Sequence, residues 1–368
     1  MTANGNGVSN GNGFAHDDES VRTGHTEPLK PTGKLDKFEK VDVTPVIGTE
    51  FPTVNLVDWL EAPDSDELLR ELAITVSRRG VVIFRGQDGI TTEHQKEIAR
   101  RLGRLSGGPE TSDLHIHPIN NHLQNPDVDD HISMVGSKQV KNYAGLGKAL
   151  SDNSGGKRQS SRTEWHTDVQ WERVPSDYSI LRMEVSPPTG GDTMFASAYE
   201  MYDRISTPYQ KFLETLSVTC SQAGIYHKLA EKMGTPIFEG PRGAPENTGS
   251  EITAIHPLVR TNPVTGWKSL FGAGIHIKEI NGLSEQESEH LKDAFLKLIT
   301  ENHDLQARCR WQKPNDLAIW DNRSVYHAAT VDYSGARAGY SARSLGERPY
   351  FDPQSISRRE GLQLEAAA

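Results

Sequence analysis

The sequence predicts a mainly β protein with flanking helices, whose core is a double-stranded β-helix, or jelly roll. Three observations favour this fold class. Many short apolar runs are separated by Gly and Pro, helical periodicity gathers in the early and late parts of the chain, and no internal repeat occurs. A parallel doubly wound sheet is the alternative, but neither Gly-x-Gly-x-x-Gly nor Gly-x-x-x-x-Gly-Lys-Ser/Thr follows an expected strand.

The chain has 368 residues, enough for one large domain or two ordinary ones. Residues 1–35 combine Gly, Asn, Ser, Thr and charged residues with almost no apolar periodicity, so we expect a disordered leader. We assign residues 36–355 to a single domain and residues 356–368 to a C-terminal tail.

The first expected elements follow the leader closely. Apolar residues recur at helical spacing over 68–76, and Gly80 follows as a helix stop. The apolar run 81–84 predicts a buried strand, and a Thr-x-x-Gln pattern opens a second helix over 92–105. The stretch 106–156 is rich in Gly, Asn, Asp and Pro and predicts a long loop.

The later part of the chain alternates expected strands with helices. A Ser-x-x-Glu pattern at 284–287 predicts a helix start. The expected elements are strands within 163–198, a helix near 199–216, a loop at 240–250, strands near 252–258 and 268–271, a helix after 284, strands at 317–320, 324–328 and 340–345, and a turn at 321–323.

Charge and cysteine content narrow the classes of partner. Lys and Arg number 40 against 50 Asp and Glu, with no long basic block, which argues against nucleic acid. The presence of only two cysteines argues against a disulfide framework and excludes a cysteine-rich zinc site. No apolar run approaches a membrane span. We therefore expect a cytoplasmic protein that acts on a small molecule without a membrane partner, and the sequence leaves a homo-oligomer open.

His166 and Asp168, with His327 further along the chain, can supply two imidazoles and one carboxylate to one metal ion. On a strand, residues two apart point to the same face, so the first pair would act together. A 2-His-1-carboxylate set is typical of non-haem Fe(II) oxygenases. The spacing alone is weak evidence, because His16 and Asp18 repeat it in the expected leader.

Two further residues suggest what binds beside the metal. Thr193 follows a Gly-Gly-Asp turn, and Arg337 lies ten residues beyond His327. Taken singly, the first is explained by turn chemistry and the second by a solvent-exposed arginine. Together they offer a hydroxyl and a planar fork of donors to the far end of a dicarboxylate that chelates the metal.

Five segments occur in order between about residues 46 and 353: Trp165–Val169, Pro187–Thr193, His256–Pro263, Trp311–His327 and Gly346–Tyr350. Together they resemble the taurine/2-oxoglutarate dioxygenase family. The resemblance implies a jelly-roll core that holds Fe(II) through His166, Asp168 and His327. It also implies 2-oxoglutarate on the iron, with its far carboxylate on Arg337 and Thr193, and oxidation by O2 with release of succinate and CO2.

The same resemblance suggests residues near the substrate. His117 matches a histidine that grips a sulfonate, Asn120 replaces a tyrosine near the same site, and the backbone amide of Val169 matches one that meets substrate. Arg162 stands where a family asparagine approaches 2-oxoglutarate. We expect His115 to face away from His117 and to be structural.

The arginine that binds the sulfonate in the family is replaced by Ser341. Arg343 lies two residues further on and shares strand parity with Ser341 and Arg337, so it can reach the same pocket from a shifted position. An equally weighted alternative is that Arg343 braces its strand or meets solvent.

The leading hypothesis is an Fe(II)- and 2-oxoglutarate-dependent dioxygenase that oxidises an unactivated C–H of a small anionic or zwitterionic substrate. A sulfonate such as taurine would then lose sulfite. The alternative within enzymes is oxidative tailoring of an amino acid or other carboxylate in specialised metabolism, by hydroxylation, desaturation or cyclisation. From other classes, a non-catalytic metal-binding β-barrel and a zinc hydrolase stay open, although zinc gives no role to an Arg337 and Thr193 clamp.

Overall fold

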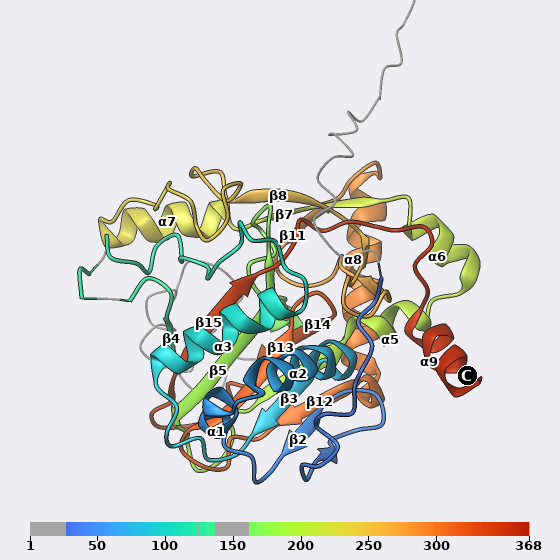
Figure 1. Cartoon of the computed structure of the whole chain (residues 1–368). Helices are drawn as coiled ribbons and strands as arrows, with labels where there is room; N and C mark the ends of the chain where they lie inside the picture. Colours follow the sequence, from blue (N-terminus) through green and yellow to red (C-terminus); the bar gives the residue numbers. More distant parts are fainter. Residues whose placement is uncertain (1–26, 124, 128, 137–161, 368) are drawn as a thin grey trace, which may run out of the picture.

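Two β-sheets face each other at the centre of the computed structural model, which describes residues 27–123, 125–127, 129–136 and 162–367 (Figure 1). The larger sheet contains, in spatial order, β1 (Val41–Asp42), β2 (Thr49–Phe51), β3 (Val81–Phe84), β13 (Asp316–Asp321), β5 (Ser176–Val185), β15 (Ala338–Leu345) and β4 (Ser133–Gly136). The smaller sheet contains β12 (Gln306–Cys309), β6 (Thr193–Ser197) and β14 (Val325–Ala329).

Alternating side chains of the larger sheet serve two separate cores. On β13, Ala318 and Trp320 pack against Phe195 of the smaller sheet. Leu317 and Ile319 point to the opposite face, where they join the core beneath the helices. Because successive residues of a strand face opposite sides, a sheet buried on both faces has an almost continuous apolar sequence.

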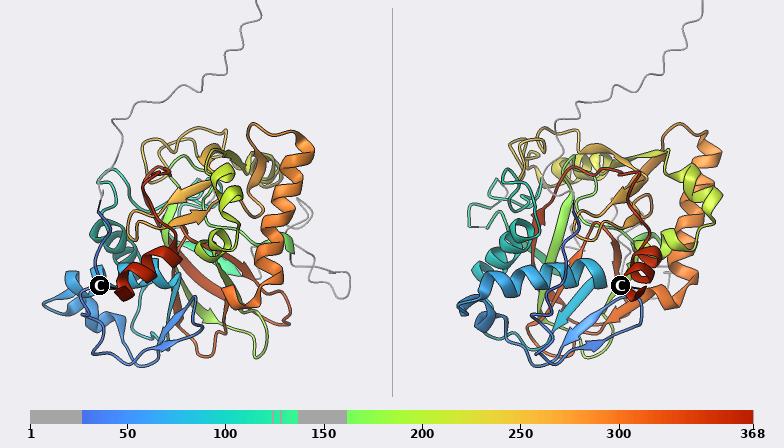
Figure 2. Two further views of the ribbon diagram at one scale, coloured as in Figure 1. Left: turned by 90° about the vertical axis from the view of Figure 1, so that its right-hand side faces the viewer. Right: turned by 45° about the vertical axis from the view of Figure 1, so that its right-hand side comes forward.

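Helices cover the outer faces of both sheets (Figure 2). The larger sheet is covered by α1 (Leu56–Glu61), α2 (Ser65–Arg79) and α3 (Thr92–Leu105). The smaller sheet packs against α5 (Ala198–Asp203), α6 (Thr207–Leu213) and α8 (Glu285–Glu301). The other helices in the described part of the chain are η2 (Arg162–Glu164), α7 (Ala223–Met233), η3 (His303–Leu305) and α9 (Arg358–Ala367).

Two small sheets extend the architecture beside the smaller central sheet. One contains β11 (Ile277–Ile280), β7 (Ser217–Ser221) and β8 (Thr253–Pro257), and the other pairs β10 (Lys268–Leu270) with β9 (Val259–Thr261). Helix α7 leaves the first of these sheets and lies near one end of the molecule (Figure 1). This end also carries the cavity described below.

The prediction of a strand-rich core with flanking helices is confirmed. The doubly wound alternative is wrong, because β2 and β3 form the single parallel ladder among the described strands. No helix within the described ranges is long and apolar enough to cross a membrane.

Helix boundaries follow the expected caps with two differences. Gly80 ends α2 at a φ of 77°, and Ser284 caps α8 with a capping box. Thr91, one residue before the expected start, caps α3. The helix expected near 199–216 is divided into α5 and α6, because the chain turns at 204–206 between them.

The expected leader ends earlier than residue 35. Its first 26 residues lie outside the described part of the chain. Leu29 donates its backbone N–H to Val264, Thr32 donates to Glu71, and Leu35 is buried. The body of the protein therefore includes residues 29–35. At the other end, the expected tail forms helix α9, in which Arg358 bonds to Glu200.

Candidate active site

His166 and Asp168 lie in an irregular segment rather than on the strand that we expected. The segment follows η2 and pairs with β14 through one isolated bridge, in which His166 and His327 exchange backbone hydrogen bonds of 3.0 and 2.8 Å. Val169 then adopts a φ of 61°, a left-handed conformation that β-branched residues rarely adopt. The ligand pair is therefore held by this bridge and a strained turn.

The three candidate metal ligands converge. The ligand atoms of His166, Asp168 and His327 all lie within 4.8 Å of one another. Both histidine Nε2 atoms lie 3.8 Å from Oδ1 of Asp168. They form the one group of three or more His, Cys, Asp or Glu with this spacing in the described chain.

Neighbouring groups orient these side chains. The Nδ1 of His166 contacts the carbonyl oxygen of Glu164 at 2.8 Å, so its Nε2 is turned to Asp168. Ser179 donates its hydroxyl to Oδ2 of Asp168 at 2.7 Å. The backbone N–H of Asp168 donates to the side-chain oxygen of Asn322 at 3.0 Å. Oδ1 of the carboxylate is thereby left on the side of the two histidines.

Electrostatics at the site suit a divalent cation. Burial tends to raise the pKa of Asp168, but Arg343, His327 and His166 outweigh it and hold this pKa below its usual value. Burial lowers the pKa of His327 to about 3. An ionised carboxylate beside a neutral imidazole is the donor set that a metal ion requires, so the residues fit an iron or similar ion.

A glycine allows a second segment to approach the metal ligands. A Cβ on Gly274 would lie 2.6 Å from the carbonyl oxygen of Trp165, and its φ is 95°. The next residue, Ile275, donates its N–H to that same carbonyl at 3.1 Å. Gly274 thus lets the chain pass close to His166 and brings His276 to the site.

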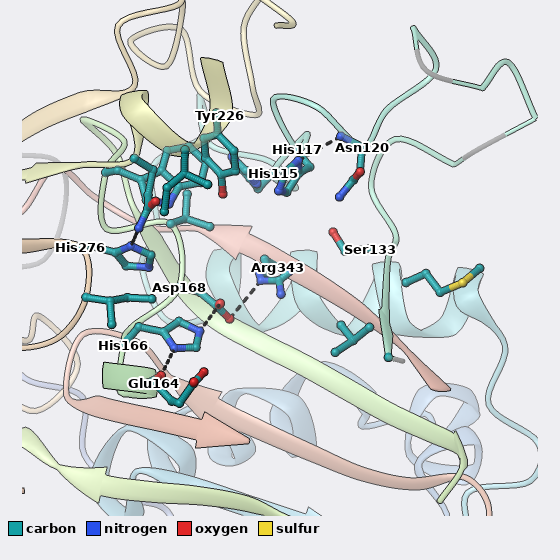
Figure 3. Close-up of a pocket in the computed structure, with 18 residues that line it drawn as sticks. His115, His117, Asn120, Ser133, Glu164, His166, Asp168, Tyr226, His276 and Arg343 are labelled. Carbon is teal, nitrogen blue, oxygen red and sulfur yellow. Dashed lines mark hydrogen bonds and ion pairs between the residues drawn. The ribbon is translucent and has the colours of Figure 1, made fainter. Parts of the chain in front are cut away.

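A cavity of about 300 Å³ opens beside the candidate ligands (Figure 3). Its walls come from the 115–120 loop, strand β4, the start of α7 and the loop before β11. It is lined by His115, His117, Asn120, Ser133, Met134, Val135, Gly136, Glu164, His166, Asp168, Val169, Trp171, Gln222, Ile225, Tyr226, Ile275, His276 and Arg343.

Four of the five candidate substrate residues line this cavity: His117, Asn120, Val169 and Arg343. Nε of Arg343 lies 3.0 Å from Oδ2 of Asp168. Ser341 is buried and does not line the cavity. Arg343 therefore reaches the cavity, which is the first of the two alternatives that the sequence left open for this residue.

His117 is held in a single tautomer. Its Nδ1 accepts the backbone N–H groups of Ile119 at 3.1 Å and Asn120 at 3.0 Å. Burial lowers its pKa well below the usual value, so the proton of the neutral ring sits on Nε2. His115 also lines the cavity, so the expectation that it faces away from His117 is wrong, because residues two apart on an extended segment point to the same face. Its contact with Glu172 agrees with a structural role.

The residues expected to bind 2-oxoglutarate fall into two groups. Arg337 is buried and donates from Nε to the carbonyl oxygen of Gly191 at 2.9 Å, which places it near Thr193. The hydroxyl of Thr193 accepts the indole N–H of Trp311 at 3.2 Å. Arg162 is not with them, because its guanidinium bonds to Asp293 on α8.

Sequence reasoning missed part of the cavity wall and one supporting residue. Gln222, Tyr226 and His276 line the cavity, but each comes from a segment with no recognisable motif. Asn322 was expected only as part of a turn. It lies in that turn and supports the ligand segment, accepting a hydrogen bond from Asp168 and one from Trp320. The signal available in the sequence was an Asn five residues before the candidate ligand His327.

Comparison with known proteins identifies close relatives. The family model described as "Taurine catabolism dioxygenase TauD, TfdA family" matches residues 34–344. The chain is 52% identical to "Alpha-ketoglutarate-dependent dioxygenase btcD" of Neocamarosporium betae, over 91% of this chain and 98% of that protein. It is 45% identical to "Alpha-ketoglutarate-dependent dioxygenase oryG" of Aspergillus oryzae, over 94% and 99% of the two chains.

More distant matches include one enzyme whose name states a substrate class. They also include solved structures. The "Alpha-ketoglutarate-dependent sulfonate dioxygenase" of Saccharomyces cerevisiae is 33% identical, over 92% of this chain and 74% of that protein. A crystal structure of a taurine dioxygenase from Burkholderia xenovorans has a TM-score of 0.60 at 23% identity and covers 86% of this chain and 92% of its own. At this identity the structural likeness concerns the fold.

Proposed function

Because the chain belongs to the TauD, TfdA family of dioxygenases, we propose that it binds Fe(II) through His166, Asp168 and His327. It is an alpha-ketoglutarate-dependent dioxygenase, alpha-ketoglutarate being another name for 2-oxoglutarate. The observation that carries the metal proposal is the convergence of these three side chains beside a cavity. The two facing sheets would then be the halves of a jelly roll, a proposal supported by the structural neighbours.

Arg337 and Thr193 are the proposed seat of the far carboxylate of 2-oxoglutarate. The hydroxyl of Thr193 already accepts the N–H of Trp311, so its own proton is directed elsewhere and can be donated to a carboxylate. Arg337 supplies the balancing charge from a buried position, where an ion pair is little screened by solvent. With O2, the bound iron and 2-oxoglutarate would supply the oxidising chemistry, yielding succinate and CO2.

The proposed substrate is a small anion held by Arg343 and His117. Both residues line the cavity, and both offer N–H donors. Arg343 contacts Asp168 in the described structure. A cation bound by Asp168 would compensate the carboxylate charge, which would leave the guanidinium available to a substrate anion. The substrate's C–H would then lie between this anion site and the metal ligands.

A carboxylate, such as an amino acid, is the second candidate for that anion. The observation that favours it is Ser341, which is buried outside the cavity where a sulfonate-binding arginine was expected. The two relatives at 52% and 45% identity are named without a substrate, whereas the named sulfonate dioxygenase is 33% identical. Oxidative tailoring by hydroxylation, desaturation or cyclisation belongs to this candidate.

The test is an anaerobic titration of the Fe(II)- and 2-oxoglutarate-loaded protein with taurine, other sulfonates and amino acids. A true substrate is expected to perturb the visible band of the metal complex and, once oxygen is admitted, to couple succinate release to its own oxidation. Arg337→Ala should raise the Michaelis constant for 2-oxoglutarate at least about tenfold, because a charge-assisted bond is lost. Unchanged 2-oxoglutarate dependence in this variant would overturn the proposed seat.

Partners and location stay proposals. Support for a small-molecule substrate rather than nucleic acid comes from the net charge of −10. A reducing compartment such as the cytoplasm is consistent with Cys220 and Cys309, which are both free and buried.

A further inference from the structure

His276 stands next to the metal ligands without belonging to them. Its ring centroid lies 5.5 Å from that of His166, with the planes at 81°, and its ring lines the cavity. It is not part of the converging ligand group. Figure 3 shows it beside His166, whereas His117 and Asn120 lie beyond the Arg343 guanidinium in that view. The cavity therefore has a second histidine wall, apart from the proposed anion site.

Gln222 holds this histidine from the start of α7. It is the N-cap residue of the helix, yet its side chain makes no capping hydrogen bond. Its amide nitrogen instead contacts Nδ1 of His276. The Gln222 side chain therefore orients the imidazole and does not cap the helix.

The second ring nitrogen of His276 is available to a ligand. No hydrogen bond joins Nε2 to another residue in the described part of the chain, although Nδ1 has a partner. Nor is Nε2 among the fully enclosed polar atoms without partners. An atom of a cavity-lining ring that is neither bonded nor enclosed faces the cavity. With Nδ1 accepting from Gln222, a neutral ring carries its proton on Nε2.

We propose that His276 is a specificity-determining residue, whose Nε2–H donates to an oxygen of the substrate at a point separate from Arg343 and His117. Gln222 is its positioning residue. This inference rests on the proposed function and narrows its substrate class. The substrate is an anion that carries a second oxygen acceptor, such as a hydroxyl or a carbonyl.

Small anions with a distal hydroxyl should bind differently from those with a distal ammonium group. An ammonium group has donors and no acceptor, so beside the N–H of His276 it would leave both partners unpaired. A hydroxyl on the same carbon skeleton accepts that N–H. Isethionate and taurine differ only in this way, as do 3-hydroxypropionate and β-alanine. These two pairs therefore test the distal group while the anion is kept constant.

The experiment measures the dissociation constant of each probe from its effect on the visible band of the anaerobic Fe(II)–2-oxoglutarate protein. In the wild-type protein, the hydroxyl member of at least one pair should bind about tenfold more tightly than the ammonium member. His276→Phe keeps an aromatic ring and removes the donor, and should abolish this preference. Gln222→Met should weaken it, because the ring is no longer held. Affinities for Fe(II) and 2-oxoglutarate should stay unchanged.

His290→Phe is the matched control, because His290 is an exposed histidine on α8 that does not line the cavity. A preference for the ammonium members, or one that survives in His276→Phe, overturns the inference and leaves the proposed function standing. Loss of Fe(II) affinity in His276→Phe also overturns it, since the residue would then act through the metal. If no probe binds, the small-anion substrate class itself fails, and this inference fails with it.

Discussion

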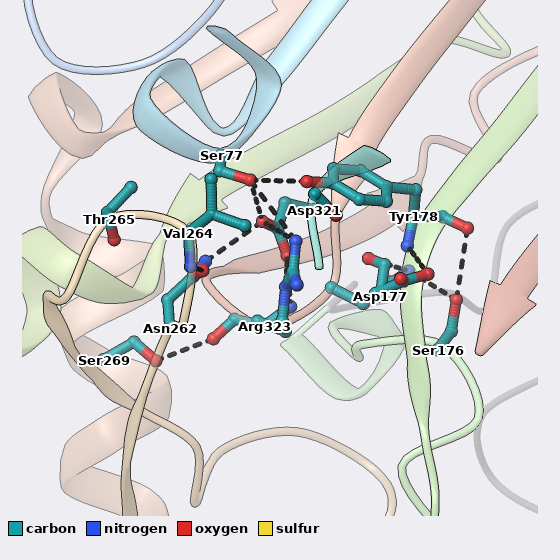
Figure 4. Close-up of polar contacts among 12 residues, drawn as sticks. Ser77, Ser176, Asp177, Tyr178, Asn262, Val264, Thr265, Ser269, Asp321 and Arg323 are labelled. Carbon is teal, nitrogen blue, oxygen red and sulfur yellow. Dashed lines mark hydrogen bonds and ion pairs between the residues drawn. The ribbon is translucent and has the colours of Figure 1, made fainter. Parts of the chain in front are cut away.

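Polar side chains are held differently in the cavity and in a second region, a buried polar network. The network consists of Ser77, Tyr178, Asn262, Asp321 and Arg323 (Figure 4). Arg323 donates to both oxygens of Asp321, at 2.8 Å each, and the same carboxylate accepts from Ser77 and Asn262. In the cavity, His117 and His276 are bonded through one ring nitrogen, and no hydrogen bond to a described residue involves the other.

This difference distinguishes polar side chains that stabilise the fold from polar side chains that are available to bind a ligand. Buried polar groups that satisfy each other contribute to one stable arrangement of the chain. Groups fixed on one side and open on the other are prepared to bind something else. The two regions meet at Asn322, which lies between Asp321 and Arg323 in sequence and accepts a hydrogen bond from the backbone of Asp168. Variants can therefore test whether stability and metal binding separate.

His166→Ala should cause the largest change, and only on the cavity side. Removal of one proposed ligand should lower turnover at least about a thousandfold, because several kcal/mol of metal-dependent stabilisation of the transition state is lost. Its side chain is partly exposed, at 27%, so the free energy of unfolding should change little. Succinate release and urea denaturation measure the two effects. Retained Fe(II) binding with normal turnover would refute the ligand assignment.

Arg323→Ala should give the opposite result. Its side chain is 2% exposed, and its removal leaves the buried Asp321 carboxylate without its cationic partner. Breaking a buried ion pair in this way costs about 3–5 kcal/mol in the free energy of unfolding. Where the variant still folds, its affinity for Fe(II) should match that of the wild type. A loss below about 1 kcal/mol would show that the network does not stabilise the fold.

Asp177 gives a pH-dependent test next to the network. Burial raises the pKa of this carboxyl from its ordinary value of about 3.8 to about 6. The folded state therefore keeps a proton that the unfolded state releases, and unfolding becomes easier as pH rises from about 4 to 6. This change amounts to roughly 3 kcal/mol. Asp177→Asn should remove it, so the variant should gain stability over the wild type at pH 7 and not at pH 4.

The outcome for Asp177 is read from urea denaturation at several pH values. The difference between variant and wild type isolates this carboxyl from other titrating groups. A difference that is the same at pH 4 and pH 7 would contradict the raised pKa.

Asn322→Ala should have smaller effects, and on both Fe(II) affinity and the free energy of unfolding. Such a result would show that the cavity and the network are not fully independent. Its amide donates to Ser179, and Ser179 in turn donates to Asp168. We expect about 10–100-fold weaker Fe(II) binding and a stability loss of about 1–3 kcal/mol. Asn322→Asp keeps the acceptor for Asp168 and removes the donors, so it should retain more metal affinity. Metal titration and denaturation of the same samples measure both quantities.

Local patterns predicted the regular elements well. Helices α2 and α8 and strands β3, β13, β14 and β15 were predicted because apolar periodicity and capping residues act within a few positions of each other. The irregular form of the segment at His166 and Asp168 was not predictable in the same way. It depends on a bridge to His327 and on a backbone bond to Asn322, both more than 150 residues away.

The candidate site was predictable where a residue type carries its own chemistry. Histidine and aspartate are residue types that commonly bind metals, and the structure brings the proposed ligands His166, Asp168 and His327 together. Gln222 and His276 are ordinary residues until folding places α7 beside the loop before β11. Strand parity with Arg337 suggested that Arg343 could reach the cavity but could not decide it, because the strand register shifts between Ala338 and Gly339.

The cavity walls come from chain segments that contribute little to the central cores. The 115–120 loop, the edge strand β4 and the start of α7 line the cavity, whereas the proposed metal ligands are tied to β14 and to the turn at Asn322. Amino-acid changes at wall positions such as Asn120, Met134 or Ile225 can therefore accumulate without disturbing the oxidation centre. Such an arrangement favours evolutionary divergence in substrate preference, and it makes these three positions suitable for directed-evolution libraries.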